Sequence, residues 1–73
     1  MRIIDQSGCV DLLYDNILLL REDNIVIAQS DDTRYQMGVY ASEEKAIKAM
    51  NRLHDRYSHM DISVWQFPKD GDL

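Results

Sequence analysis

The apolar side chains of this chain change from a two-residue repeat to a helical repeat across a single residue, Ser42. Before it, Tyr35, Met37 and Val39 alternate with more polar neighbours, a pattern typical of a strand with one covered face. After it, apolar residues recur at spacings of three and four. Ser42 is a preferred N-cap residue, because its hydroxyl accepts a hydrogen bond from the first helical turn. The sequence therefore predicts a strand that runs directly into a helix at about 43–58.

The predicted helix is amphipathic and begins with the acidic residues Glu43 and Glu44, which suit the positive end of the helix dipole. A turn of about 100° per residue gathers one apolar set on a single face. That set is Ala46, Ala49, Met50, Leu53 and Tyr57. The opposite face is charged, so the helix is expected to cover a sheet on one side only.

Short β-type runs separated by turn residues occupy most of the remaining chain. The expected strands are Arg2–Asp5, Cys9–Leu12, Ile17–Arg21, Ile25–Gln29, Arg34–Tyr40 and Ile62–Phe67. The predicted fold class is α+β, with an antiparallel meander sheet of about five to six strands on a single helix and a final strand after it. Residues 1–67 form the expected domain. Pro68 ends the last strand, and residues 68–73 are expected to be a flexible tail.

The central hairpin is apolar on both faces, whereas a sheet covered on one side alternates apolar and polar residues. One helix of about sixteen residues is ~24 Å long and covers one side of such a sheet. The other side needs a second copy, a partner protein or a ligand. We therefore predict a homo-oligomer, whose expected interface consists of Leu18, Leu20, Val26 and Ala28 or their opposite-face neighbours.

The orientation of two strands follows less directly from their sequences. In the strand before the helix, Tyr35, Met37 and Val39 are the more apolar set, so they are expected to face the helix. The open face then carries Arg34, Gln36, Gly38 and Tyr40. In the last strand the inner pair is either Ile62 with Val64 or Trp65 with Phe67.

Composition restricts the classes of partner and compartment. The chain has 73 residues, a formal net charge of −5 and one cysteine, Cys9, so it can form no intrachain disulfide. No apolar run has the length of a signal-peptide core or a membrane span. These features favour a cytoplasmic protein with no membrane role. The negative charge also opposes attraction to nucleic acid, so no nucleic-acid partner is expected.

No motif in the chain predicts catalysis, a cofactor or a metal site. His54 and His59 are five residues apart, which separates them by roughly 140° on a helix. Cys9 has no histidine near it in sequence, and the three glycines are isolated rather than grouped in a phosphate-binding loop. The aspartates lack the spacing of a calcium loop, and turn chemistry accounts for them. We therefore expect a non-enzymatic protein.

The segment Met37–Ala46 carries a first resemblance. It is similar to the strand-to-helix junction of three-stranded DNA-binding domains, namely the plant ethylene-response type and the arm-binding domains of tyrosine integrases. That resemblance implies a sheet face that reads the DNA major groove. The charges oppose this function, because the hairpin places Glu22, Asp23, Asp31 and Asp32 where such domains carry basic and aromatic residues.

Three parts of the chain carry a second resemblance that covers most of its length. They are Met1–Ile4 with Gly8 and Asp11, Tyr40–Ala46 with Met50, Leu53 and Tyr57, and Trp65–Pro68. Together they resemble small uncharacterised proteins carried by phages and integrative elements of Gram-positive bacteria. The resemblance implies an accessory protein that antagonises host defence. It would act as a homo-oligomer that sequesters a nucleotide-type signalling molecule, or alternatively as an inhibitor that binds a host defence protein through its acidic surface.

A nucleotide site needs a cation for phosphate and an aromatic ring for stacking. Arg34 is the expected phosphate contact, and Tyr35, Tyr40 or Trp65 is the expected stacking surface. The alternative is structural, because a small domain uses its aromatic residues for packing and an arginine at a strand edge improves solubility.

Overall fold

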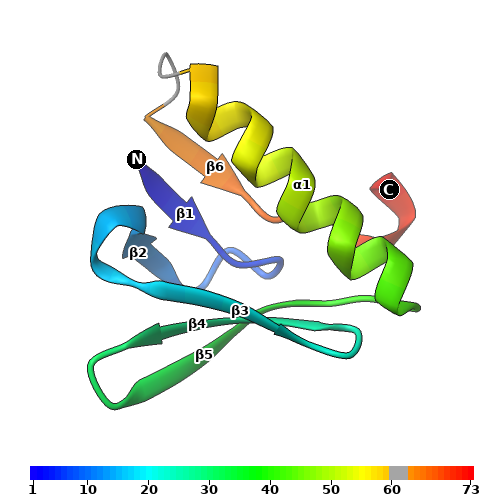
Figure 1. The fold of residues 1–73 in the computed structure, drawn as a ribbon, viewed down its shortest axis with the longest axis horizontal. Helices are drawn as coiled ribbons and strands as arrows, with labels where there is room; N and C mark the ends of the chain where they lie inside the picture. The colour runs from blue at the N-terminus through cyan, green and yellow to red at the C-terminus, as the bar shows by residue number, and fades with distance from the viewer. Residues whose placement is uncertain (60–62) are drawn as a thin grey trace.

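The chain folds into two three-stranded sheets and one helix in a computed structural model that describes residues 1–59 and 63–73 (Figure 1). Sheet A has the strand order β2-β1-β6, and sheet B has the order β3-β4-β5. The elements are β1 (Arg2–Ile4), β2 (Asp11–Leu13), the 3₁₀ turn η1 (Tyr14–Asn16), β3 (Leu18–Glu22), β4 (Ile25–Ser30), β5 (Thr33–Val39), α1 (Glu43–His59), β6 (Val64–Gln66) and η2 (Asp70–Asp72).

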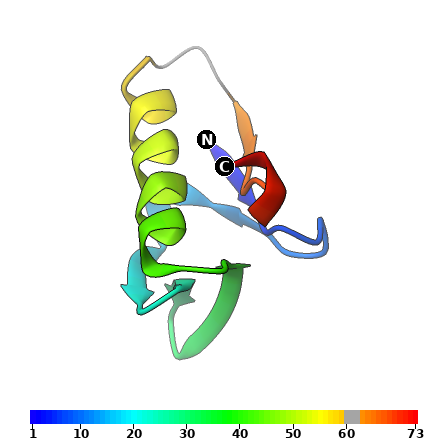
Figure 2. The same ribbon diagram turned by 90° about the vertical axis from the view of Figure 1, so that its right-hand side faces the viewer.

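The predicted α+β class and single helix are confirmed, but the prediction of one meander sheet of five to six strands is wrong. The turn η1 interrupts the chain between β2 and β3, so these two strands do not pair. The last strand pairs parallel with β1, which places Ile3 beside Trp65. Sheet B and α1 therefore form the connection from β2 to β6, the two strands that flank β1 in sheet A (Figure 2).

Sheet B is a meander whose strands are joined by two-residue turns. Glu22 pairs with Ile25, and Ser30 pairs with Thr33. Asp23 and Asp31, the first residues of the two turns, have φ angles of 52° and 53°. Aspartate tolerates this left-handed conformation better than most residues do. The turn aspartates therefore act on backbone geometry, as the sequence predicts.

A β-bulge in β5 reverses the expected orientation of its last residues. Ile27 pairs with Gln36 and Val26 with Gly38, so Met37 has no residue opposite it. One extra residue moves every later side chain to the other face. The expected orientation of Tyr35 and Met37 toward the core is confirmed, but the expected faces of Gly38, Val39 and Tyr40 are wrong. Gly38 is buried opposite Val26 on the core face. Val39 is 47% exposed and Tyr40 only 2% exposed.

The helix begins as predicted and ends within one residue of the predicted end. The Ser42 hydroxyl accepts a hydrogen bond from the backbone N–H of Lys45 at 3.2 Å. Of the predicted apolar face, Ala46, Ala49 and Leu53 are fully buried. Met50 is half-buried and Tyr57 is exposed. The buried stripe is therefore narrower than predicted, which leaves apolar side chains on one flank of α1.

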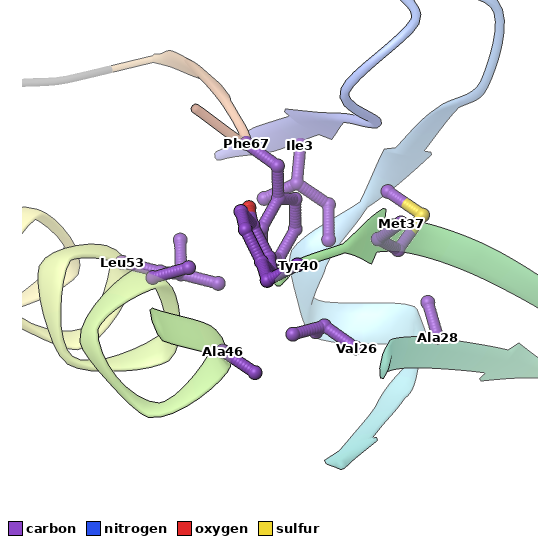
Figure 3. Packing of buried hydrophobic residues seen from close by; sticks show 9 residues of the cluster. Ile3, Val26, Ala28, Met37, Tyr40, Ala46, Leu53 and Phe67 are labelled. Carbon is purple, nitrogen blue, oxygen red and sulfur yellow. The ribbon is translucent and has the colours of Figure 1, made fainter. Parts of the chain in front are cut away.

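The core lies where α1 meets both sheets (Figure 3). Sheet A contributes Ile3 to this core. Phe67, the residue directly after β6, is also part of it. The second alternative for the last strand is thus observed, since Trp65 and Phe67 point inward and Val64 is exposed. Ile62, named in the first alternative, lies outside the described residues. The ring of Tyr40 packs among side chains from the helix and both sheets.

Residues 68–73, for which the sequence predicts a flexible tail, lie against α1 with specific contacts. The Asp70 carboxylate accepts a hydrogen bond from the Ala41 N–H at 2.6 Å and pairs with the Lys45 ammonium at 3.1 Å. The Arg52 guanidinium donates to the Asp72 carbonyl at 3.1 Å. Because Leu73 also packs against the core, these contacts argue against a free tail.

Candidate functional site

The four residues predicted to form a ligand site, Arg34, Tyr35, Tyr40 and Trp65, do not form one site, although Arg34 and Tyr35 line a common depression of sheet B. Arg34 lies on the outer face of sheet B, where its guanidinium pairs with Glu22 at 2.8 Å. Trp65 belongs to sheet A, and Tyr35 is half-buried against the core. The bulge and the division into two sheets separate residues that a single sheet would have placed side by side.

Tyr40 has a structural position rather than a ligand-facing one. Its hydroxyl donates a hydrogen bond to the Pro68 carbonyl at 2.9 Å, and the side chain is almost fully buried. Burial, together with the nearby Asp70 carboxylate, raises the pKa of Tyr40 to about 12. The ring lies over Gly38, where an added Cβ would be 2.7 Å from its Cε2 atom. Tyr40 therefore has no face available for stacking on a ligand, and the prediction for this residue is wrong.

The four residues predicted as an oligomer interface also divide between two faces. Residues opposite each other in an antiparallel pair share a face, and Leu18 pairs with Gln29 while Leu20 pairs with Ile27. Val26 and Ala28 point the other way and are fully buried in the core. The interface prediction is therefore wrong for Val26 and Ala28. Leu18, which is 61% exposed, and Leu20 lie on the outer face.

The basic residues are unevenly distributed. Three of the eight lie outside α1 and are paired with carboxylates, since Arg2 contacts Asp11, Arg21 contacts Glu43 and Arg34 contacts Glu22. Four more lie on α1 at spacings of three and four, which places them on one flank of the helix. These four are Lys45, Lys48, Arg52 and Arg56. This basic flank faces the C-terminal segment, as the contacts of Lys45 and Arg52 show.

A groove of about 330 Å³ lies between this flank of α1 and strand β6. Its lining residues are Arg52, Asp55, Arg56, Trp65, Gln66 and Pro68. Two guanidinium groups against one carboxylate give the lining a formal charge of +1, in a chain whose net charge is −5. The groove is therefore a local exception to the acidic character of the protein.

The indole of Trp65 has a fixed position at the edge of this groove. Its ring meets Phe67 edge to face, with ring centroids 4.8 Å apart and planes at 77°. Phe67 is buried in the core, so it supports the indole from the inside. Gln66 is anchored as well, because its amide donates to the Asp5 carbonyl at 3.3 Å. The β6 side of the groove is thus pre-organised by the core and by sheet A.

The chemistry of the groove is that of recognition. Arginine forms paired hydrogen bonds with phosphate or carboxylate, and an indole stacks on planar rings. Cys9 lies exposed in the β1–β2 turn and does not line the groove. Among residues 1–59 and 63–73, no group of three or more metal-ligating side chains is close enough to hold an ion. Within the same ranges, no helix is long and apolar enough to cross a membrane.

Of the groove residues, Trp65 is a site residue predicted from the sequence, whereas Arg52 and Arg56 are not. Their spacing of four residues carries a usable signal, because it places two guanidinium groups on one flank of a predicted helix. What the sequence does not contain is the pairing of β6 with β1, which brings Trp65 to that flank. Comparisons of the chain with protein-family models, curated proteins and solved structures found no match.

Proposed function

We propose that this chain is a non-enzymatic accessory protein of a phage or mobile element that antagonises host defence by sequestering a nucleotide-type signalling molecule as a homo-oligomer. The observation that supports this proposal is the joint position of Arg52, Arg56 and Trp65 around one groove. The groove has the size of small-molecule sites, which occupy about 300–1,000 Å³. The proposal moves the ligand site from Arg34 and Tyr40 to the groove between α1 and β6 and retains Trp65.

Binding of an anionic ligand to this acidic protein depends on where its cationic side chains lie. A protein of net charge −5 repels anions at long range, so an anionic ligand has to be held by short-range contacts. Arg56 is exposed and, within the described residues, forms no ion pair, so its guanidinium is available to a phosphate. Trp65 offers a ring to a base or nicotinamide-like group. Together they supply the two contacts that a nucleotide requires.

Calorimetry against cyclic mononucleotides, cyclic dinucleotides and ADP-ribose derivatives tests the proposal. We expect one class to bind the intact protein, and we expect Arg56→Ala to weaken that binding at least tenfold, because the loss of a charge-assisted hydrogen bond costs about 1.5–3 kcal/mol. Trp65→Leu, which keeps an apolar side chain beside Phe67, is expected to weaken binding by removing the stacking ring.

Arg34→Ala is the matched control, because it also removes an exposed guanidinium, from sheet B and outside the groove. Arg34 and Tyr35 line a separate depression of about 280 Å³ together with Glu22. Loss of binding in Arg34→Ala with full binding in Arg56→Ala would place the ligand there and overturn the assignment to the groove. Native mass spectrometry of protein from expressing cells would identify any retained molecule directly.

The second candidate function is inhibition of a host defence protein through the acidic surface. The two turns of sheet B carry four exposed acidic residues, which are Glu22, Asp23, Asp31 and Asp32. If no nucleotide binds the intact protein, this function takes precedence. The same negative charge leads us to propose no binding to duplex DNA at physiological salt. A salt-sensitive gel shift at micromolar protein would contradict that proposal.

A further inference from the structure

The two edges of sheet B differ in how they are covered. At the β5 edge, the Gln6 N–H donates to the Met37 carbonyl and the Gln6 side chain accepts from the Val39 N–H, both at 2.8 Å. At the β3 edge, no described segment other than β4 hydrogen-bonds to the backbone of residues 18–22, and no other strand of sheet B lies beyond β3 (Figure 1). Strand β3 is therefore an open edge, and β5 is a partly closed one.

The turn geometry determines which backbone groups of β3 point outward. In a two-residue turn the flanking residues bond to each other, so the N–H and C=O groups of Glu22 face Ile25 in β4. Because these groups alternate along an antiparallel strand, those of Leu19 and Arg21 point away from β4. Charged side chains, proline and bulges usually block pairing at an edge. The strand has no proline or bulge, and its two charged residues, Arg21 and Glu22, lie at the turn end, which leaves Leu18–Leu20 without a charge.

An apolar surface borders this edge and extends onto the helix. Leu18 is 61% exposed, and Ile47 and Tyr57 on α1 are 39% and 44% exposed. Two contacts hold this flank of α1 over β3 and η1: Glu43 pairs with Arg21 at 3.1 Å, and the Tyr57 and Tyr14 ring centroids are 4.7 Å apart. Ile47 shares the stripe with Glu43 by helical spacing, so it lies on the same side.

We propose that β3 pairs antiparallel with β3 of a second copy of this chain, around a two-fold axis at Leu19. Centring on Arg21 would set two guanidinium groups directly opposite each other, and centring on Ile17 would run into the 3₁₀ turn η1. Centring on Leu19 instead sets Leu18 of each copy opposite Leu20 of the other. In this register the strand is complementary to itself, which favours a second copy over an unrelated partner.

This dimer specifies the surface of the homo-oligomer included in the proposed function and does not depend on nucleotide capture. It joins two sheets B into one six-stranded sheet. The groove between α1 and β6 is lined by the opposite flank of the helix, so both grooves stay accessible. Each dimer would therefore carry two independent ligand sites.

Disulfide trapping tests the register. Directly opposed residues of a non-hydrogen-bonded pair have Cα atoms about 4.5 Å apart, within the range for a disulfide, which reaches about 6.8 Å. In a Cys9→Ser background, an equimolar mixture of Leu18→Cys and Leu20→Cys chains should therefore form a covalent dimer under mild oxidation. Either variant alone should form little, because a shift of two residues separates the introduced thiols by about 8 Å between Cα atoms. Equal cross-linking in all three samples, or none in the mixture, would overturn the register.

Light scattering of the otherwise natural chain tests the interface. We expect twice the chain mass of 8.5 kDa and the single-chain mass for Leu18→Glu, which places a carboxylate opposite Leu20 and diagonal to Glu22 of the other copy. Val39→Glu is the matched control, since Val39 is 47% exposed on the partly closed edge of the same sheet, and it should remain dimeric. A monomeric natural chain would overturn both this interface and the proposed homo-oligomer. A dimer broken by Val39→Glu but not by Leu18→Glu would overturn this interface alone. Ligand capture is tested separately, by calorimetry.

Discussion

The two sheets have three strands each but are held together in different ways. Sheet B contains consecutive strands of five, six and seven residues joined by tight turns. Sheet A contains three strands of three residues, and its parallel pair joins Ile3 to Trp65 across most of the chain. Closing so long a loop has an entropic cost, and three ladder pairs offset little of it. Sheet A therefore depends on contacts beyond its own backbone ladder.

Side-chain hydrogen bonds supply many of those contacts. The Asp5 carboxylate accepts hydrogen bonds from the Cys9 and Val10 N–H groups at 2.8 and 3.0 Å and from the Ser7 hydroxyl at 2.7 Å. The Gln6 amide donates to the Pro68 carbonyl at 3.2 Å. Sheet B therefore depends chiefly on backbone geometry, and sheet A on a few polar side chains. Substitutions in each sheet test this difference.

The largest effect is expected at Gly38, where the backbone geometry of sheet B is tightest. In Gly38→Ala, the added Cβ would lie 2.7 Å from Cε2 of Tyr40 and 2.8 Å from its hydroxyl oxygen. The ring is buried and hydrogen-bonded to Pro68, so it has little freedom to move aside. We expect the free energy of unfolding to fall by about 2–3 kcal/mol, a typical cost of overpacking, as measured by urea denaturation.

Gly71→Ala is the control, because a Cβ at that position would have no atom within 4 Å. It should change stability by less than about 0.5 kcal/mol. A double-mutant cycle identifies the cause, since Gly38→Ala should cost much less once Tyr40→Ala has removed the ring. If Gly38→Ala costs the same in both backgrounds, the clash with Tyr40 is not its origin.

The next effect is expected at Asp5, the polar side chain on which sheet A depends most. Asp5→Ala leaves the Cys9 and Val10 N–H groups without their acceptor, in a site where Asp5 itself is buried. Unsatisfied donors of this kind cost about 1–3 kcal/mol. We expect a loss near the middle of that range, about 2 kcal/mol. Asp11→Ala, which removes only an exposed ion pair with Arg2, should cost less than about 1 kcal/mol. Equal losses in the two variants would contradict the special role of Asp5.

The same contrast explains which parts of the fold the sequence predicts. The β3–β4 hairpin and α1 are predicted because their signals are local: two apolar runs around turn residues for the hairpin, and the Ser42 cap with a helical apolar repeat for α1. The bulge at Met37 is not predicted, because alternation in β5 appears regular until the pairing with β4 is known. The parallel pairing of β6 with β1 is not predicted either, because no short-range pattern encodes a partner some sixty residues away.

The candidate site follows the same division. The guanidinium groups of Arg52 and Arg56 can be placed on one helix flank from spacing alone. Their proximity to Trp65 results from the non-local closure of sheet A. The assignment of Tyr40 to an open face failed because one extra residue in β5 reverses every orientation that follows it. Local signals thus identified the types of residue, and tertiary pairing decided which of them meet.

Acid should loosen sheet A before sheet B. Burial alone would raise the pKa of Asp5, but its hydrogen bonds from Ser7, Val10 and Cys9 outweigh burial, so the pKa is lowered. A lowered pKa stabilises the fold above the ordinary value of 3.8, and this contribution is lost as the pH falls through the folded-state pKa. The stability advantage of the natural chain over Asp5→Asn should therefore shrink as the pH falls from 5 toward 2. Amide exchange at the two pH values should show the Val10 amide losing protection before the Ala28 amide of sheet B, and the opposite order would contradict the comparison.

The smallest effect is expected at Asp70, where the C-terminal segment meets the start of α1. The Ala41 N–H and the Lys45 ammonium hydrogen-bond to this exposed carboxylate and lower its pKa. Because the contacts lie at the surface, Asp70→Asn should leave the unfolding temperature unchanged. It should nevertheless speed amide exchange at Ala41 several-fold, since that N–H loses a charged acceptor 2.6 Å away. If exchange at Ala41 is already fast in the natural chain and Asp70→Asn does not change it, then residues 68–73 fray in solution as the sequence predicts, and the contacts of Asp70 do not hold the segment against the helix.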